Sequence, residues 1–310
     1  MRQLPKMFHS LFLRRLYFFI WLITQKSNFD IFILRYPPID PFLLLFSPFL
    51  KPIVTVHHTK EVEEIAQTRT GLKRKAALAI EKIIGNIILK QTAAIITVTA
   101  EIYDYEIKRC GFKPKYIYPN GIDSRLIGLT GDKRGCEPEF IFVSSYFANW
   151  HGLDLFLDIL EVDDSPCLLH LVGQISPADL NRIKTTDSLS QRIMMHGKLD
   201  AVEINKLMAS CDLGLSSFAL FRNNMREACT LKVREYLAAG LAVFSGHKDS
   251  GLPDDFAYYR HNESSLKNII SYAIATRSVE RQTIRSAALP YIEKKQLLMD
   301  CYEWIQGLNT

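Results

Sequence analysis

The residues best suited to chemistry in this chain of 310 residues lie between positions 227 and 246. Glu227 precedes a predicted helix, Lys232 falls in its first turn, and Glu235 follows within about one further turn. Unpaired N–H groups at a helix N-terminus, with a lysine beside them, favour binding of a phosphate group. Carboxylates repel phosphate but accept hydrogen bonds from hydroxyl groups. The spacing therefore predicts a ligand with both phosphate and sugar or ribose hydroxyls, unless the two glutamates are incidental residues on a solvated helix face.

Local signals define the helix that positions these groups. Thr230 is a suitable N-cap, and Gly240 is suited to the left-handed conformation that ends many helices. We expect Leu231 to belong to the apolar stripe of this helix. The apolar run at 241–244 is typical of a buried parallel strand. Because Thr230 and Leu231 begin the helix, we expect both to contact the same ligand as Lys232.

Composition excludes several classes of site. Six cysteines are scattered without a C-x-x-C pair or a Cys/His metal spacing, which is typical of reduced thiols in the cytoplasm. There is no H-E-x-x-H or D-x-D motif, so we expect neither a metal nor another cofactor. Residues 1–29 contain five basic residues and no acidic one, and the rest of the chain is neutral. This distribution argues against binding of nucleic acid along an extended face.

The basic N-terminal region includes a predicted helix around residues 16–24 that is rich in aromatic and aliphatic residues. Its apolar run is too short to span a bilayer. One interpretation is a helix whose apolar side packs on the sheet of its own domain. The other is peripheral contact of residues 1–26 with an anionic membrane surface. The two interpretations are compatible with each other.

Strand and helix patterns alternate along both halves of the chain, which predicts an α/β protein with two Rossmann-like, doubly wound parallel sheets. We expect a first domain at 1–123, a polar linker at 124–138, a second domain at 139–288 and a C-terminal helix at 289–310, with a break at Pro290. The expected strands are 30–38, 52–58, 94–98 and 115–118, followed by 140–143, 167–172, 192–196, 212–216 and 241–244. One long amphipathic helix is expected at 71–92.

Several segments resemble, in the same order, those of retaining GT-B glycosyltransferases of the family-4-like group. Glu227 and Glu235 match the E-x7-E signature of that group. The turn at 119–123 is similar to its P-N-G-V-D motif. Further matches are Leu171-Val172-Gly173, Met195-His196-Gly197-Lys198 and Cys211-Asp212-Leu213-Gly214-Leu215. The resemblance covers nearly all of residues 30–260 and implies the GT-B fold of two Rossmann-like domains.

This resemblance also implies a nucleotide-sugar donor and assigns residues to it. By the resemblance, Glu227 contacts the donor sugar and Glu235 binds the ribose of the nucleotide. Lys232 and the start of its helix hold the pyrophosphate. Gly173 ends a strand at the nucleotide site, and the turn at His196-Gly197 lies against the base.

His57 is the candidate site residue from the first domain. It follows a strand at the edge where ligands collect in open parallel sheets, and the family often has a histidine there that contacts the donor sugar near the reacting carbon. His58 is the second choice, and a histidine that only caps the next helix is the structural alternative. By the same resemblance, the C-terminal helix at 289–310 crosses back to the first domain.

The chain departs from the family at two places. It lacks the family's initial strand and glycine-rich loop, so we expect a first domain that is truncated at its N-terminus. A shortened sheet exposes an edge strand, which the basic-aromatic helix, a partner chain or a membrane could cover. The loop at 144–149 also lacks the cation that usually grips the pyrophosphate, which leaves Lys232, Arg222 and Arg226 to supply positive charge.

These patterns favour an enzyme that moves a sugar from a nucleotide-sugar donor to a glycan or lipid-linked acceptor with retention of configuration. The family predicts a role in bacterial surface polysaccharide synthesis, in the cytoplasm or at the inner face of the membrane. The alternative is a weakly active or inactive pseudo-glycosyltransferase that binds a nucleotide as the partner of a second chain. A sugar-nucleotide epimerase, which uses the same architecture, is a third hypothesis.

Overall fold

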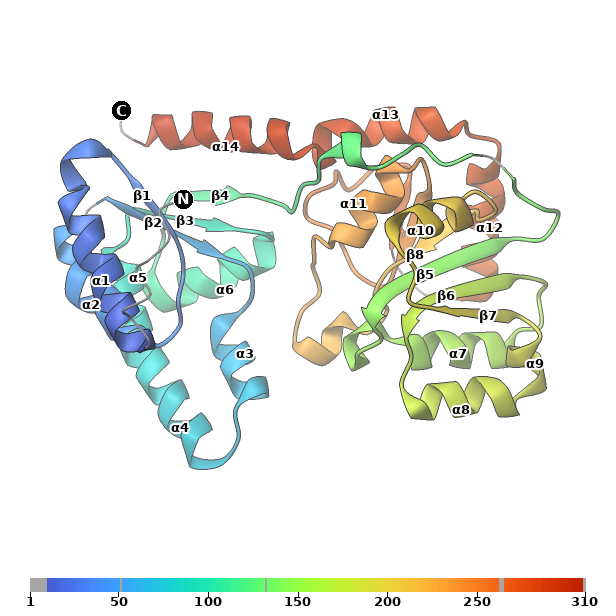
Figure 1. Ribbon diagram of the computed structural model, residues 1–310, viewed down its shortest axis with the longest axis horizontal. Coiled ribbons are helices and arrows are strands. Elements are labelled where there is room, and N and C mark those ends of the chain that lie inside the picture. Colours follow the sequence, from blue (N-terminus) through green and yellow to red (C-terminus); the bar gives the residue numbers. More distant parts are fainter. Residues whose placement is uncertain (1–9, 51, 132, 262–264, 309–310) are drawn as a thin grey trace. The chain divides into compact units, whose positions relative to one another are not determined.

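The computed structural model describes residues 10–50, 52–131, 133–261 and 265–308. The chain divides into two compact units, residues 1–117 and 118–310, and each is built around its own parallel β-sheet (Figure 1). The predicted α/β class with two Rossmann-like parallel sheets is therefore confirmed. None of the helices in the described ranges combines the length and the apolar character that a membrane span requires.

The first unit contains a four-stranded sheet in which all paired strands run parallel. The strand order is the order along the chain, β1-β2-β3-β4. The two central strands consist almost entirely of buried residues, which is typical of parallel sheets. The four predicted strands are confirmed with shorter bounds: β1 Phe32–Arg35, β2 Ile53–His57, β3 Ala94–Thr97 and β4 Lys115–Ile117.

Helices pack around this first sheet. The helical segments in the described residues are α1 Leu11–Thr24, η1 Lys26–Asn28, α2 Pro41–Phe46, η2 Ser47–Phe49, α3 Glu61–Thr68, α4 Gly71–Ile80, η3 Glu81–Gly85, α5 Asn86–Gln91 and α6 Ala100–Cys110. Phe19 and Leu22 of α1 share one core with Leu43 of α2, Leu89 of α5 and Phe32 of β1. The prediction of an N-terminal helix that packs on its own domain is therefore confirmed, although the helix begins earlier than expected.

The single regular helix expected at 71–92 is wrong, because the π-helical segment η3 separates α4 from α5. A π turn contains an extra residue, and here Glu81 is completely buried at its start. The Glu81 carboxylate accepts hydrogen bonds from Tyr36 Oη (2.7 Å) and Arg109 Nη2 (2.6 Å). Gly85 leaves room for this cluster, since a Cβ there would lie 2.3 Å from Glu81 Oε1. The amphipathic pattern of the sequence does not reveal such a buried polar cluster.

The second unit contains a six-stranded sheet whose paired strands are also parallel, in the order β10-β9-β8-β5-β6-β7. Its strands are β5 Glu139–Tyr146, β6 Leu168–Gln174, β7 Ile193–Gly197, β8 Leu213–Leu215, β9 Ala242–Ser245 and β10 Tyr259–His261. The first five were predicted, whereas β10 was not, because its Tyr-Arg-His sequence has no apolar run. The chain passes from β5 through β6 to β7 and then returns to the other side of β5 at β8. β5 and β8 therefore form the topological switch point, where open parallel sheets bind ligands at the strand carboxyl ends.

The helical segments of the second unit are η4 Ser124–Leu126, η5 Asn149–His151, α7 Leu153–Val162, α8 Pro177–Thr185, α9 Asp187–Ser190, α10 Ala201–Met208, η6 Leu220–Asn223, α11 Leu231–Ala238, α12 Leu266–Arg277, α13 Arg281–Ile292 and α14 Lys294–Gly307. The break expected at Pro290 comes after it, because α13 continues through this proline to Ile292. The segment expected as a linker, 124–138, is hydrogen-bonded to this unit, for example from Thr130 N to Ala239 O (3.0 Å).

Gly240 ends α11 as expected, with φ +83°, and a Cβ at this position would lie 2.5 Å from the carbonyl oxygen of Arg281. We predict that Gly240→Ala lowers the free energy of unfolding by at least about 2 kcal/mol, because the left-handed conformation alone costs a non-glycine residue about 1–2 kcal/mol. Gly131→Ala is the control, since its Cβ would meet no atom within 4 Å. Urea denaturation measures both changes, and equal losses would contradict this role of Gly240.

Candidate functional site

The carboxyl ends of three neighbouring strands bring small polar residues to the switch point. Ser144 lies near the end of β5, Ser216 directly follows β8, and Ser245 ends β9. Helix α11 begins beside them, since Oγ1 of its N-cap, Thr230, lies 3.4 Å from Ser216 Oγ. Hydroxyl groups and a helix N-terminus are thus gathered at the edge where parallel sheets bind ligands.

Lys232 supplies positive charge at this edge. Its Nζ is buried and lies 5.2 Å from the centre of the Phe142 ring of β5. No atom in the described part of the chain accepts a hydrogen bond from this ammonium group. Burial lowers the pKa of Lys232 to about 8, and the carboxylate of Glu235 partly opposes the shift. Because a buried charge without a partner is costly, the site favours an anionic ligand that pairs with Lys232.

His151 is a neutral neighbour of Lys232. Burial and the charge of Lys232 lower the pKa of His151 to about 4. Its Nδ1 accepts a hydrogen bond from Ala148 N (3.0 Å), so the proton resides on Nε2, which lies 3.3 Å from Ser144 Oγ. Ser144 Oγ in turn donates to the carbonyl oxygen of Tyr146 (2.7 Å). These bonds hold the loop after β5 without adding positive charge.

His247, in the loop after β9, offers an unused acceptor. Its Nδ1 lies 2.9 Å from the carbonyl oxygen of Ser217, and because a carbonyl only accepts, Nδ1 carries the proton and Nε2 does not. Nε2 is buried and has no hydrogen-bond partner among the residues that the structure describes. Burial lowers the pKa of His247, and the charge of Lys232 acts in the same direction. One unpaired donor and one unpaired acceptor at the same strand edge suit a ligand with both phosphate and hydroxyl groups.

The two glutamates of the sequence signature have different environments. Glu235 is an exposed residue of α11, close enough to Lys232 to raise the pKa of that lysine. Glu227 is half-buried in the segment before α11, where its Oε2 accepts a hydrogen bond from Ser250 Oγ (2.5 Å). A backbone bridge between Glu227 and Lys248 joins this segment to the loop after β9. The structure therefore brings Glu235 and Lys232 together and places Glu227 at the entrance to the helix.

Leu231 and Gly173 were also predicted to lie in this site. Leu231 is 51% exposed, so the expectation that it belongs to the buried stripe is wrong. Val233 lies on the buried side of α11, and two residues of a helix correspond to a rotation of about 200°. Gly173 lies near the end of β6 with φ +125°, where a Cβ would lie 1.5 Å from the carbonyl oxygen of Ser144. Gly173 thus allows the ends of β5 and β6 to approach closely.

The predicted base-contacting turn, His196-Gly197, lies on β7, which β6 separates from β5. His196 Nε2 is 3.0 Å from His170 Nδ1, and His170 Nε2 is 3.0 Å from Glu139 Oε2 at the amino end of β5. Gly197 has φ +65° and open space around it. The structure does not bring this turn to Lys232, and its contact with a base stays a prediction.

A buried ion pair that was not predicted from the sequence holds the site together. Arg234 of α11 is completely buried and pairs with Asp249 through both terminal nitrogens. Its Nε donates to the carbonyl oxygen of Asn120 (2.9 Å), and Asn120 Nδ2 donates to that of Cys229 (2.6 Å). These contacts tie the loop before α11 to the 119–123 turn. No local pattern marks Arg234 as buried, because its partners are distant in sequence.

Arg222 is one of the three cations expected from the sequence to supply positive charge to the pyrophosphate. Its Nη2 lies 2.7 Å from Asp154 Oδ2, and its Nη1 donates to the carbonyl oxygen of Asn149 (2.9 Å). Its charge is thereby neutralised within the protein.

His57, the candidate from the first unit, is completely buried at the end of β2. Its Nδ1 lies 3.0 Å from Glu61 Oε1, its Nε2 lies 3.1 Å from Thr55 Oγ1, and its ring stacks on Tyr36. Burial lowers the pKa of His57 to about 4. The neighbouring His58 is exposed. Contact between His57 and a sugar would require this environment to open, so the assignment stays a prediction, with His58 as the accessible alternative.

Two buried carboxylates accompany His57. Burial raises the pKa of Glu61 to about 7 and that of Glu106 to about 8, and repulsion from Glu61 contributes to the second shift. Glu106 Oε2 accepts a hydrogen bond from Arg109 Nη1 (2.9 Å). At neutral pH this pair therefore retains a proton. Ligand atoms of His57, Glu61 and Glu106 all lie within 4.8 Å of one another, a spacing that could also hold a metal ion.

No model of a known protein family matches this sequence, and no curated protein matches it either. Several solved structures, in contrast, are similar to this chain. The apo form of the lipopolysaccharide outer core galactosyltransferase WaaB matches with a TM-score of 0.67 and 13% identity, covering 96% of this chain and 81% of that chain. A glycosyltransferase from Rickettsia africae gives a TM-score of 0.65 and 14% identity, covering 100% and 84%. The chain has the GT-B fold. A third GT-B structure, Anabaena HepE in complex with UDP-glucose, matches with a TM-score of 0.61 and 15% identity, and the match covers 93% of this chain and 82% of that chain.

We predict that Lys232→Met raises the free energy of unfolding of the unliganded protein by about 1–3 kcal/mol at neutral pH, the cost of an unpaired buried polar group. Folding lowers the pKa of Lys232 to about 8, so the penalty is complete below that pH and decreases as the pH rises toward the value of free lysine. The stability that Lys232→Met gains over the parent chain should therefore decrease over the same pH range. Lys206→Met, on an exposed part of α10, is the control. Chemical denaturation measures both, and a less stable Lys232→Met protein would contradict the argument.

The raised pKa values of Glu61 and Glu106 predict that the protein loses stability as the pH rises from 4.5, the ordinary pKa of glutamate, to about 8. The stabilisation is complete below the pKa of free glutamate and disappears as the pH rises through about 7 and about 8. Glu106→Gln cannot ionise, so we expect its unfolding temperature to fall less than that of the parent chain between about pH 6 and about pH 9. Asp104→Asn, an exposed residue of the same helix, should leave the parent profile unchanged. Parallel profiles for Glu106→Gln and the parent would refute a buried titrating pair.

Proposed function

We propose that this protein is a glycosyltransferase that uses a nucleotide-diphosphate sugar as donor. The observation that carries the proposal is the buried ammonium group of Lys232 at the start of α11, beside the switch point, which has no hydrogen-bond partner among the described residues. A diphosphate would pair with this charge and with the N–H groups of the first helical turn. The similarity of the fold to that of WaaB and HepE supports the proposal. The HepE structures with UDP and UDP-glucose make a uridine nucleotide the first donor to test.

In this proposal the two signature glutamates bind hydroxyl groups. Glu235 binds the ribose, close to the charge of Lys232, and Glu227 binds the donor sugar from the entrance to α11. Nε2 of His247 is a further acceptor for a ligand hydroxyl. During transfer, Lys232 stabilises the negative charge that develops on the departing phosphate.

The finer parts of the proposal concern the reaction and its setting. The sugar is transferred with retention of configuration, and the leaving phosphate helps to deprotonate the incoming hydroxyl. The acceptor is a glycan or a lipid-linked sugar in bacterial surface polysaccharide synthesis, at the inner face of the membrane. These parts rest on the family resemblance of the sequence.

A second candidate function is nucleotide binding without turnover, as the partner of another chain. The burial of His57 and the ion pair of Arg222 with Asp154 favour this function, because both residues are expected from the sequence to contact the donor and both already have partners within the protein. Under both functions the protein binds a nucleoside diphosphate. Only the transferase would also cleave the nucleotide sugar and release the nucleoside diphosphate.

We predict that Glu235→Gln weakens binding of UDP about 10-fold or more, the effect of losing a charged hydrogen bond. Glu227→Gln should leave binding of UDP unchanged and reduce transfer or hydrolysis of UDP-sugars, because its partner is the sugar. Glu303→Gln, an exposed residue of α14, is the control. Calorimetry measures binding, and release of UDP from a panel of UDP-sugars measures turnover.

The outcomes separate the hypotheses. UDP release from at least one sugar nucleotide supports the enzyme, and binding without release supports the non-catalytic partner. Conversion of one UDP-sugar into its epimer would indicate an epimerase. If neither UDP nor another nucleoside diphosphate binds, the proposed site is wrong.

A further inference from the structure

Helix α1 of the first unit is apolar on both of its sides. Phe19 and Leu22 face the core, as described above. Leu13, Ile20 and Trp21 are nevertheless 44%, 47% and 42% exposed on the same helix. A helix that is apolar all round is normally buried, so the outward side of α1 is suited to an apolar environment that the first unit does not supply.

A second exposed apolar stripe lies on the neighbouring helical segments. Ile80, Ile83 and Ile87 are 40%, 64% and 43% exposed, at a spacing that places them along one side of α4, η3 and α5. Helix α2 contacts both α1 and α5. Leu45 of α2 and Phe49 of η2 are also exposed. We call the outward surface of α1, α2, η2, α4, η3 and α5 the apolar-basic face.

The charges on this face are mostly positive. The first unit has 18 Lys and Arg residues against 9 Asp and Glu, a formal charge of +9. Lys73, Arg74 and Lys75 are exposed on α4, and Lys82 is exposed on η3. Within 10–50 and 71–92, the described acidic residues are Asp30, which is exposed, and Asp40 and Glu81, which are buried and paired with Arg15 and Arg109.

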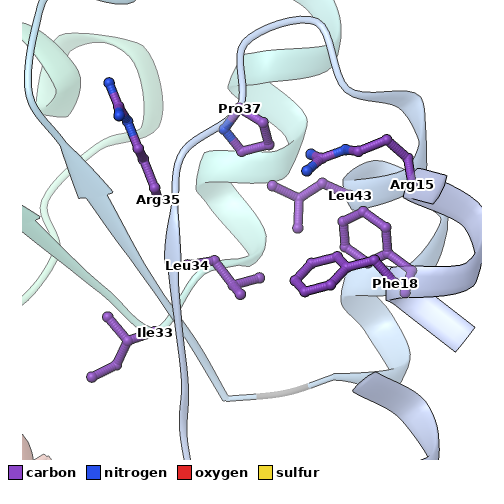
Figure 2. Close-up of a pocket in the computed structure, with 8 residues that line it drawn as sticks. Arg15, Phe18, Ile33, Leu34, Arg35, Pro37 and Leu43 are labelled. Carbon is purple, nitrogen blue, oxygen red and sulfur yellow. The ribbon is translucent and has the colours of Figure 1, made fainter. Parts of the chain in front are cut away.

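A groove of about 300 Å³ is lined by residues of α1, α2 and β1, the outermost strand of the described sheet. Phe18, Leu34 and Leu43 line it beside Arg15 (Figure 2). Arg15 is paired with Asp40 of the same unit. Figure 2 shows Arg35 on the other side of β1 from Leu34, and Arg35 is exposed at the strand edge. The groove therefore presents an apolar wall with a cation at its margin.

We infer that the apolar-basic face binds the surface of a bilayer that contains anionic lipids. Exposed aromatic and aliphatic side chains enter the interfacial region, and lysines and arginines pair with lipid phosphates. Each basic residue near an anionic surface contributes about 1 kcal/mol. A second copy of the chain is the poorer occupant, because two units of charge +9 would repel each other. The inference does not depend on the proposed transferase activity.

Sedimentation of the full-length protein with lipid vesicles tests this inference. We expect little binding to vesicles of phosphatidylcholine alone, strong binding when phosphatidylglycerol is added, and loss of that binding at high salt. The double variants Ile20→Ser/Trp21→Ser and Lys73→Glu/Lys75→Glu should each reduce the bound fraction at least about fivefold. Phe112→Ser is the control, because Phe112 is 89% exposed in the same unit outside this face.

Three results would overturn the inference. They are equal binding to neutral and anionic vesicles, equal losses for the control and the double variants, and concentration-dependent dimer formation in place of vesicle binding. Unchanged unfolding temperatures and unchanged UDP binding of the variants show that they remain folded, so loss of lipid binding is distinguishable from failure of the nucleotide site. Residues 1–9, which belong to the membrane contact expected from the sequence, lie outside the described residues.

Discussion

A buried ammonium group that has no hydrogen-bond partner among the described residues is the constraint on which the second unit depends. Lys232 can be buried only because α11 packs closely on β5 and β8. Gly214 makes this approach feasible, since a Cβ there would lie 2.3 Å from the Tyr236 ring. Tyr236 Oη then accepts a hydrogen bond from Val143 N (3.0 Å), next to the Phe142 ring that lies under Lys232. The hydrophobic packing of the sheet thus offsets the cost of a charge that a bound anion would neutralise.

Two ion pairs, one buried and one at the surface, organise the loops around this ammonium group. Arg234 with Asp249 and Arg222 with Asp154 each neutralise a cation and fix a loop at the strand ends. A preorganised loop loses little conformational entropy when a ligand binds. Groups without hydrogen-bond partners among the described residues are therefore the features that mark the proposed binding residues of this unit.

Much of this architecture was predictable because it depends on local patterns. Apolar runs predicted nine strands. The positions of Lys232 in the first turn of α11 and of Gly240 after its end were also predicted and are confirmed. The sequence did not reveal Arg234, the free Nε2 of His247, or the burial of His57, since each depends on residues that meet only in the folded chain. Strand β10 was not predicted for a related reason: it is recognised by its pairing with β9, because its own sequence has no apolar run.

The π turn at Glu81 has a consequence for the exposed surface of the first unit. The same carboxylate accepts the N–H of Ile39 (2.7 Å), a β-branched residue with φ +59°, so an unfavourable turn is held by this one side chain. One additional residue in a helix rotates everything before it by about 100°. The π turn that contains this buried acid therefore sets the direction in which Lys73, Arg74 and Lys75 point. A related chain without that acid, and with a regular helix here, would present the same three cations on a different side.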